Sequence, residues 1–122
     1  MKRVILSLVA ALFVSLPAQG ASIALTLTLP EAGELQHKAY TCEGQDGRLM
    51  VDYVNADPNF LALVPVEGKQ LIFASVVSAT DVIYVSGKYE WLTKGPEARL
   101  IDLTADKDAP PLMSCLEAND TP

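Results

Sequence analysis

Short apolar stretches separated by turn residues recur along most of this chain, and they constrain its fold more than any other feature. Their apolar residues alternate with polar ones or form brief β-branched runs, a pattern typical of strands and without the period of a long helix. The stretches cover residues 23–29, 38–43, 49–53, 60–66, 70–77, 82–85, 89–92, 98–103 and 112–116. This spacing predicts a single all-β domain of eight strands or slightly more.

The short connections imply an antiparallel sheet, and such a sheet leaves unpaired edges unless it closes on itself. We therefore expect a small antiparallel eight-stranded β-barrel, which has an interior that side chains can just fill. The segment at residues 21–29 is the element least fixed by the pattern. It can join the sheet, cover an edge, or pair with a second copy of the chain to form a homodimer.

The N-terminal residues 1–20 have the features of a signal peptide. Lys2 and Arg3 form a basic start, residues 4–16 are almost entirely apolar, and small residues follow, so we expect cleavage before Ala21. The apolar run is too short to span a bilayer. No cysteine follows it that could carry acyl chains. The expected product is residues 21–122, a soluble periplasmic domain without a membrane anchor.

The charge of this domain limits its partners. Without residues 1–20 the chain has 7 basic and 15 acidic residues, a net charge of −8. That charge repels nucleic acids and anionic membrane surfaces, and it attracts basic proteins through a long-range field. We expect no nucleic-acid partner.

Both cysteines, Cys42 and Cys115, remain in the secreted domain. In an oxidising compartment one pair permits one intramolecular bridge. A redox pair normally sits two residues apart, and a thiolate metal site needs more ligands than two cysteines and the lone His37. We predict a structural disulfide and no metal site. Closing so long a loop stabilises a small domain by roughly 4 kcal/mol in the chain-entropy model.

Two neighbouring segments, residues 80–84 and 89–95, hold the candidate binding residues. On local grounds alone each has an ordinary role. Tyr84 and Trp91 suit core packing, Thr80-Asp81 suits a turn, and Lys94 suits a solvated strand end. What stands out is a hydroxyl at Thr80 and an ammonium at Lys94, fourteen positions apart on consecutive strands.

These segments resemble the loop pair of the periplasmic and membrane-bound inhibitors of C-type lysozyme. That family has a Ser-Gly-x-x-Tyr loop followed by a Tyr-x-x-x-Thr-Lys-Gly loop. The second loop is matched here at every fixed position: Tyr89, Thr93, Lys94 and Gly95. In the first loop Tyr84 matches, whereas Thr80 and Asp81 stand where the family has Ser and Gly. The resemblance extends over roughly residues 38–116.

The resemblance implies an inhibitor that occupies the active-site cleft of a C-type lysozyme, a basic enzyme, and thereby protects bacterial peptidoglycan from host defence. It implies that the seven loop residues named above bind lysozyme, with Lys94 and Thr80 each bonded to one of the two catalytic carboxyl groups. Thr80 keeps the hydroxyl but adds a methyl group. Asp81 brings a negative charge, which weakens binding if it faces those carboxyl groups and strengthens binding if it faces basic cleft rims.

The sequence gives less support to other functions. His37 is alone, and no phosphate loop, metal-ligand spacing or nucleophile elbow occurs, so we expect neither an enzyme nor a cofactor. The main alternative is a periplasmic barrel that binds a small apolar ligand, because eight-stranded barrels can enclose one. A third reading keeps the fold and directs it at an endogenous muralytic enzyme. A deep apolar cavity would favour the ligand-binding alternative, and a filled barrel with protruding loops would favour the inhibitor.

Overall fold

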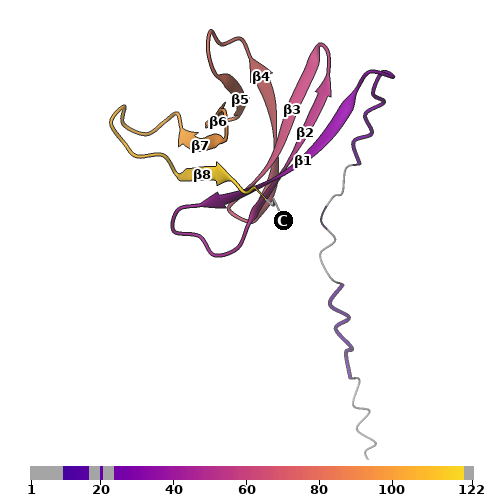
Figure 1. Ribbon diagram of the computed structural model, residues 1–122. Helices are drawn as coiled ribbons and strands as arrows, with labels where there is room; N and C mark the ends of the chain where they lie inside the picture. The colour runs from indigo at the N-terminus through magenta and orange to yellow at the C-terminus, as the bar shows by residue number, and fades with distance from the viewer. Residues whose placement is uncertain (1–9, 17–19, 21–23, 120–122) are drawn as a thin grey trace, which may run out of the picture.

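A computed structural model describes residues 10–16, 20 and 24–119 of the chain. Eight antiparallel strands follow one another around a closed barrel, each paired with the next and the last with the first (Figure 1). The strands are β1 (Glu34–Cys42), β2 (Leu49–Ala56), β3 (Asn59–Val66), β4 (Lys69–Val76), β5 (Val82–Ser86), β6 (Tyr89–Lys94), β7 (Glu97–Asp102) and β8 (Met113–Glu117). The described residues include no helix that is long and apolar enough to span a membrane. The predicted all-β barrel is confirmed.

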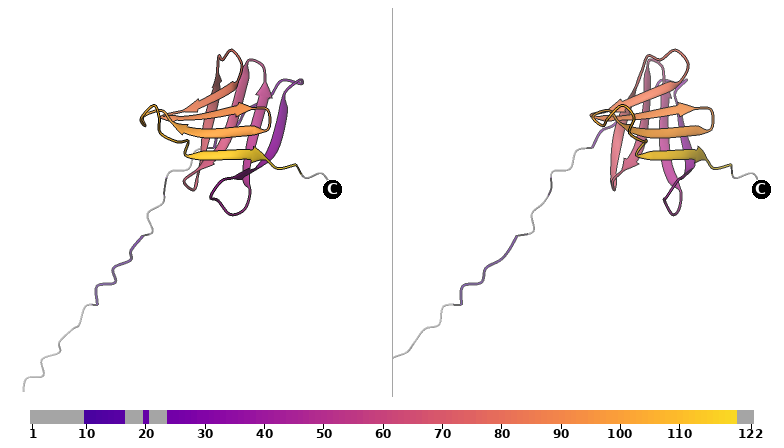
Figure 2. Two further views of the ribbon diagram at one scale, coloured as in Figure 1. Left: turned by 60° about the vertical axis from the view of Figure 1, so that its left-hand side comes forward. Right: turned by 90° about the vertical axis from the view of Figure 1, so that its left-hand side faces the viewer.

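The barrel consists of two four-stranded halves, β1–β4 and β5–β8, which cross at a steep angle (Figure 2). The halves meet at two short seams. At one seam β4 pairs with β5 only over Ala74–Val76, and at the other β1 pairs with β8 only over Tyr40–Cys42. Pairs within each half are mostly longer, such as the seven residue pairs between β1 and β2. Because both seams are closed, the half made of the short strands β5–β8 is paired at its two edges with the long strands β4 and β1.

The interior follows from the two-residue period of the strands, since every second side chain points inward. The largest fully buried side chains are Trp91, Phe73, Leu100, Val51 and Val64. No polar or charged residue is buried among the described residues. Large aromatic and β-branched side chains thus fill the barrel, as expected for eight strands.

The seam between β1 and β8 carries the disulfide. Cys42 and Cys115 are direct cross-strand partners, with their Cα atoms 4.0 Å apart, and both are buried. The predicted bridge is confirmed. It links residues 73 positions apart in sequence, and it closes the barrel where the strand pairing is shortest.

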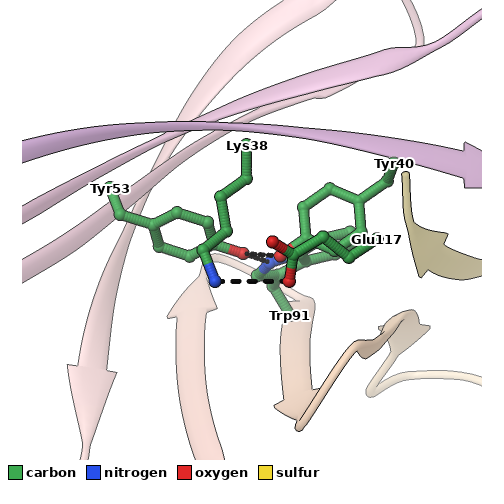
Figure 3. Close-up of polar contacts among 5 residues, drawn as sticks. All are labelled: Lys38, Tyr40, Tyr53, Trp91 and Glu117. Carbon is green, nitrogen blue, oxygen red and sulfur yellow. Dashed lines mark hydrogen bonds and ion pairs between the residues drawn. The ribbon is translucent and has the colours of Figure 1, made fainter. Parts of the chain in front are cut away.

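Buried hydroxyl groups inside the barrel are paired with one another. The indole Nε1 of Trp91 donates to the Tyr53 hydroxyl at 2.9 Å, and that hydroxyl lies 2.8 Å from the hydroxyl of Tyr40 (Figure 3). Burial raises the pKa of Tyr53 well above its ordinary value, and the bond to Tyr40 adds to this shift. Lys38 and Glu117 form an ion pair at 3.4 Å beside this chain of bonds. The network fixes β1, β2 and β6 against one another.

The N-terminal part of the sequence differs from expectation in two places. The first strand begins at Glu34, four residues earlier than predicted, because Glu34–Lys38 extends the ladder along β2. The alternating segment at 23–29 forms no strand over its described residues 24–29, where Leu25 and Leu27 remain exposed. Most of the predicted signal peptide lies outside the described residues and stays a prediction.

Candidate functional site

Successive antiparallel strands send alternate connections to opposite ends of the barrel. The connections at residues 57–58, 77–81 and 95–96 leave at one end, which we call the loop end. The connections at residues 43–48, 67–68, 87–88 and 103–112 leave at the opposite end, called the far end. Both candidate loops therefore belong to the loop end, and the fold brings them together.

Thr80 and Lys94 are exposed on adjoining connections of the loop end. Thr80 lies in the bend that leads into β5, and Lys94 is the last residue of β6. The hydroxyl of Thr93 donates to the carbonyl oxygen of Val82 at 3.3 Å, and these two residues are also cross-strand partners. The base of one loop is thus tied to the base of the other. Within residues 24–119 Lys94 has no ion pair, so its ammonium group is available to a partner.

Gly95 makes the tight turn after Lys94 possible. Its φ angle is +56°, a conformation that residues with a Cβ atom rarely adopt. No atom lies within 4 Å of the position a Cβ would take, so the backbone conformation, not crowding, demands glycine here. Gly95 therefore contributes by setting the turn that orients Lys94.

Asp81 lies close to Lys94 in the folded chain. Together with Leu92, Glu97 and Arg99 the two residues line an outer groove of about 270 Å³. The Oδ1 atom of Asp81 is buried and has no hydrogen-bond partner among the described residues. Asp81 thus places a carboxylate at the base of the Thr80 loop, with one oxygen that no described residue hydrogen-bonds.

The two candidate tyrosines lie in different places: Tyr84 lines the barrel mouth beneath Thr93 and Gly95, and Tyr89 lies at the far end. Tyr84 is only 6% exposed and packs against Tyr53, with ring centroids 5.7 Å apart, and burial raises its pKa. Tyr89 begins β6 at the far end, where the ammonium of Lys88 lies 5.2 Å from its ring centroid. A strand of this length holds Tyr89 about 16 Å from Lys94. The structure thus joins Thr80, Asp81, Thr93, Lys94 and Gly95 at one end and leaves Tyr89 at the other.

The barrel interior offers little room for a ligand. Its mouth at the loop end is a depression of about 180 Å³ lined by polar and aromatic residues, including Gln36, Lys38 and Tyr84. Ligand pockets are commonly larger and mainly apolar. A filled barrel with protruding loops was the arrangement expected of an inhibitor, so the geometry favours that function over ligand binding. No cluster of three or more His, Cys, Asp or Glu side chains suited to a metal occurs in the described part of the chain.

Sequence reasoning missed the surface around Asp81. Phe60 and Val76, exposed on β3 and β4, line a second groove beside Asp81, while Glu97 and Arg99 of β7 line the first. These residues come from strands far apart in sequence, and no local pattern marks them. The one available signal was Val76, an apolar residue at an outward strand position, since Phe60 has the inward phase of Ala62 and Val64.

Comparison with known proteins gives a consistent result. A family model described as membrane-bound lysozyme-inhibitor of c-type lysozyme matches residues 40–109. Proteins named membrane-bound lysozyme inhibitor of C-type lysozyme are 42% identical over 77 residues in Cupriavidus necator and 40% identical over 76 residues in Pseudomonas aeruginosa. The first match covers 62% of this chain and 61% of the relative, and the second covers 61% and 60%. The chain thus spans about three fifths of the length of these relatives.

A solved structure is similar over nearly its whole length. It is the crystal structure of Pseudomonas aeruginosa MliC in complex with hen egg white lysozyme, with a TM-score of 0.64 and 33% sequence identity. The superposition covers 82% of this chain and 99% of that chain. The similarity therefore extends over most of this chain.

Proposed function

This chain belongs to the family of membrane-bound lysozyme inhibitors of c-type lysozyme, and from that premise we propose that it inhibits a C-type lysozyme by placing its loop end in the enzyme's active-site cleft. It carries out no reaction of its own. The observation that carries the proposal is the pairing of an exposed hydroxyl, Thr80, with an unpaired ammonium, Lys94, on two loops whose bases are tied together. With a cleavable signal peptide, the inhibitor would act in the periplasm.

Lys94 is the residue we expect to contribute most to binding. A retaining glycosidase holds two carboxyl groups about 5 Å apart, and one of them is ionised. An ammonium group facing that carboxylate forms a charge-assisted hydrogen bond, which a partly dehydrated cleft strengthens. Because Lys94 has no ion pair within residues 24–119, no such pair has to be broken on binding.

Thr80 suits the other carboxyl group, which acts as the acid and is protonated. A hydroxyl can donate or accept a hydrogen bond, so it fits a carboxyl group in either protonation state. Losing Thr80 should cost less than losing Lys94, because neutral hydrogen bonds are weaker than charged ones. Gly95 and Thr93 hold the loops in position, and Asp81 lies between them and the outer grooves.

The test is inhibition of a C-type lysozyme on cell-wall substrate by the oxidised domain and three variants. Lys94→Ala should weaken inhibition at least a hundredfold, about 3 kcal/mol, because an enzyme carboxylate is left buried and unpaired. Thr80→Ala should weaken it less. Lys88→Ala removes the same charge at the far end, where Lys88 pairs with Asp102 at 3.1 Å, and it serves as the matched control.

Two results would contradict the proposal. Absence of inhibition by the folded wild-type domain would remove the function itself. Equal inhibition by the wild type and Lys94→Ala would keep the function but remove the loop end as its site.

A further inference from the structure

The second groove beside Asp81 has the features of a pocket for a long side chain. Its volume is about 390 Å³, and it lies at the rim of the barrel mouth, where β3, β4 and β5 reach the loop end. The residues that line it are Phe60, Ser75, Val76, Ser78, Asp81, Val82 and Tyr84. Its walls are largely apolar or aromatic, two hydroxyls add polar contacts, and Asp81 carries the only charge among these residues.

The unpaired oxygen of Asp81 points to a missing partner. Buried polar atoms in folded proteins almost always have a hydrogen-bond partner, and a buried charged group without one destabilises the fold. Oδ1 of Asp81 has none among the described residues. Lys94 and Arg99 line the neighbouring groove, yet neither forms an ion pair with Asp81. Asp81 thus has hydrogen-bonding capacity that the described residues of the free domain do not use.

We propose that this groove is a specificity pocket that receives an arginine or lysine side chain of the basic partner protein. The inference rests on the proposed function, and it assigns a recognition role to Asp81 and the groove beside it. The aliphatic stem of such a side chain packs along apolar walls such as Phe60 and Val76, while its cationic head reaches the carboxylate. A guanidinium or ammonium group in the groove forms a charge-assisted hydrogen bond with the partly exposed carboxylate of Asp81.

The charge arrangement favours a cation over other occupants. An anionic side chain would face Asp81 at close range, and a purely apolar one would cover the carboxylate without pairing it. Either alternative costs affinity, so the pocket discriminates among partners. It lies at the same end as Lys94, so one partner can engage both. The two contacts require partner groups of opposite charge, because Lys94 pairs with a carboxylate and Asp81 pairs with a cation.

The test compares wild type, Asp81→Asn and Asp46→Asn, using a C-type lysozyme as the probe. Affinity is measured at low and high salt, and the Tm of each free domain is measured in parallel. Asp81→Asn should bind at least tenfold more weakly at low salt and lose part of the salt dependence, because it lacks one ion pair with the partner. Its Tm should equal or exceed that of wild type, because the unpaired charge is gone. Asp46→Asn removes an exposed carboxylate at the far end and should behave as wild type.

Weaker binding by Asp81→Asn without a loss of Tm identifies a binding role for Asp81. An aspartate that only formed the turn would lower the Tm when replaced. Wild-type affinity in Asp81→Asn, or a fall in its Tm, overturns the pocket. If Lys94→Ala abolishes inhibition while Asp81→Asn has no effect, the pocket is wrong and the proposed function stands. If the wild-type domain binds no C-type lysozyme, both fall.

Discussion

The two ends of the barrel differ in whether their charged residues are paired within the domain. At the far end, Asp102 accepts hydrogen bonds from the Thr104 amide at 2.8 Å and the Thr104 hydroxyl at 2.6 Å, and it pairs with Lys88 at 3.1 Å. These contacts, the Thr104 hydroxyl foremost, lower the pKa of Asp102 from 3.8 to about 2. At the loop end, Asp81 has a buried oxygen without a partner, and Lys94 has no ion pair within residues 24–119.

This difference separates structural charges from recognition charges. A charge that is paired within its own domain gains little from a partner, because an existing interaction must be broken first. An unpaired charge lowers the stability of the free domain but contributes fully on binding. The charges at the far end therefore stabilise the fold, and the proposed function assigns the unpaired charges of the loop end to a partner.

The largest effect on stability should come from the disulfide, which lies towards the far end. Replacing Cys42 and Cys115 together by alanine should lower the free energy of unfolding by roughly 4 kcal/mol, because the long loop is no longer closed in the unfolded chain. Urea unfolding measures the change. Inhibition by the folded protein should be unchanged, since the loops lie on β4–β7. Loss of both stability and inhibition would show that the two ends are coupled.

Two glycines give a matched test of the comparison. Gly87 at the far end and Gly95 at the loop end have nearly the same φ, +55° and +56°, and both have open space around them. Alanine at either position should destabilise the domain by about 1 kcal/mol through backbone strain. Only Gly95→Ala should also weaken lysozyme inhibition, since it redirects Lys94. Equal inhibition by the two variants would argue against the loop end as the binding surface.

The smallest effect concerns acid stability and Asp102. Because its folded pKa is lowered from 3.8 to about 2, its contribution to stability is present above pH 3.8 and is lost as the pH falls towards 2. Between these values wild type should lose more stability than Asp102→Asn, as followed by thermal unfolding at each pH. Inhibition by Asp102→Asn at neutral pH should match wild type. Parallel stability curves for the two proteins would contradict the assignment.

The sequence predicted the barrel because its strands alternate clearly and its turns carry glycine and other turn residues. Cys42 and Cys115 could be paired because they are the only cysteines. The segment at 23–29 does not join the sheet over residues 24–29, because alternation identifies an extended segment but not a pairing partner. Its pairing with a second copy stays a prediction. Leu25 and Leu27 have the two-residue spacing of a strand, but they are exposed and lie outside every strand.

The candidate site stays a prediction, and the structure shows only where its residues lie. The resemblance named Thr80 and Lys94, and the fold places both at one end, but it also named Tyr89, which lies at the other end of β6. A motif gives the order of residues along the chain, whereas a binding surface also depends on which end of the barrel each of these residues occupies. The unpaired oxygen of Asp81 and the groove lined by Phe60 and Val76 depend on contacts between separate strands, so no sequence pattern contains them.

The central claim, that the loop end meets the enzyme and the far end does not, is tested most directly by amide hydrogen exchange of the domain with and without a C-type lysozyme. We predict slower exchange in the complex at residues 77–81 and 93–97, and unchanged exchange at residues 43–48 and 103–112. Protection of those far-end segments, with the loop end unchanged, would contradict it.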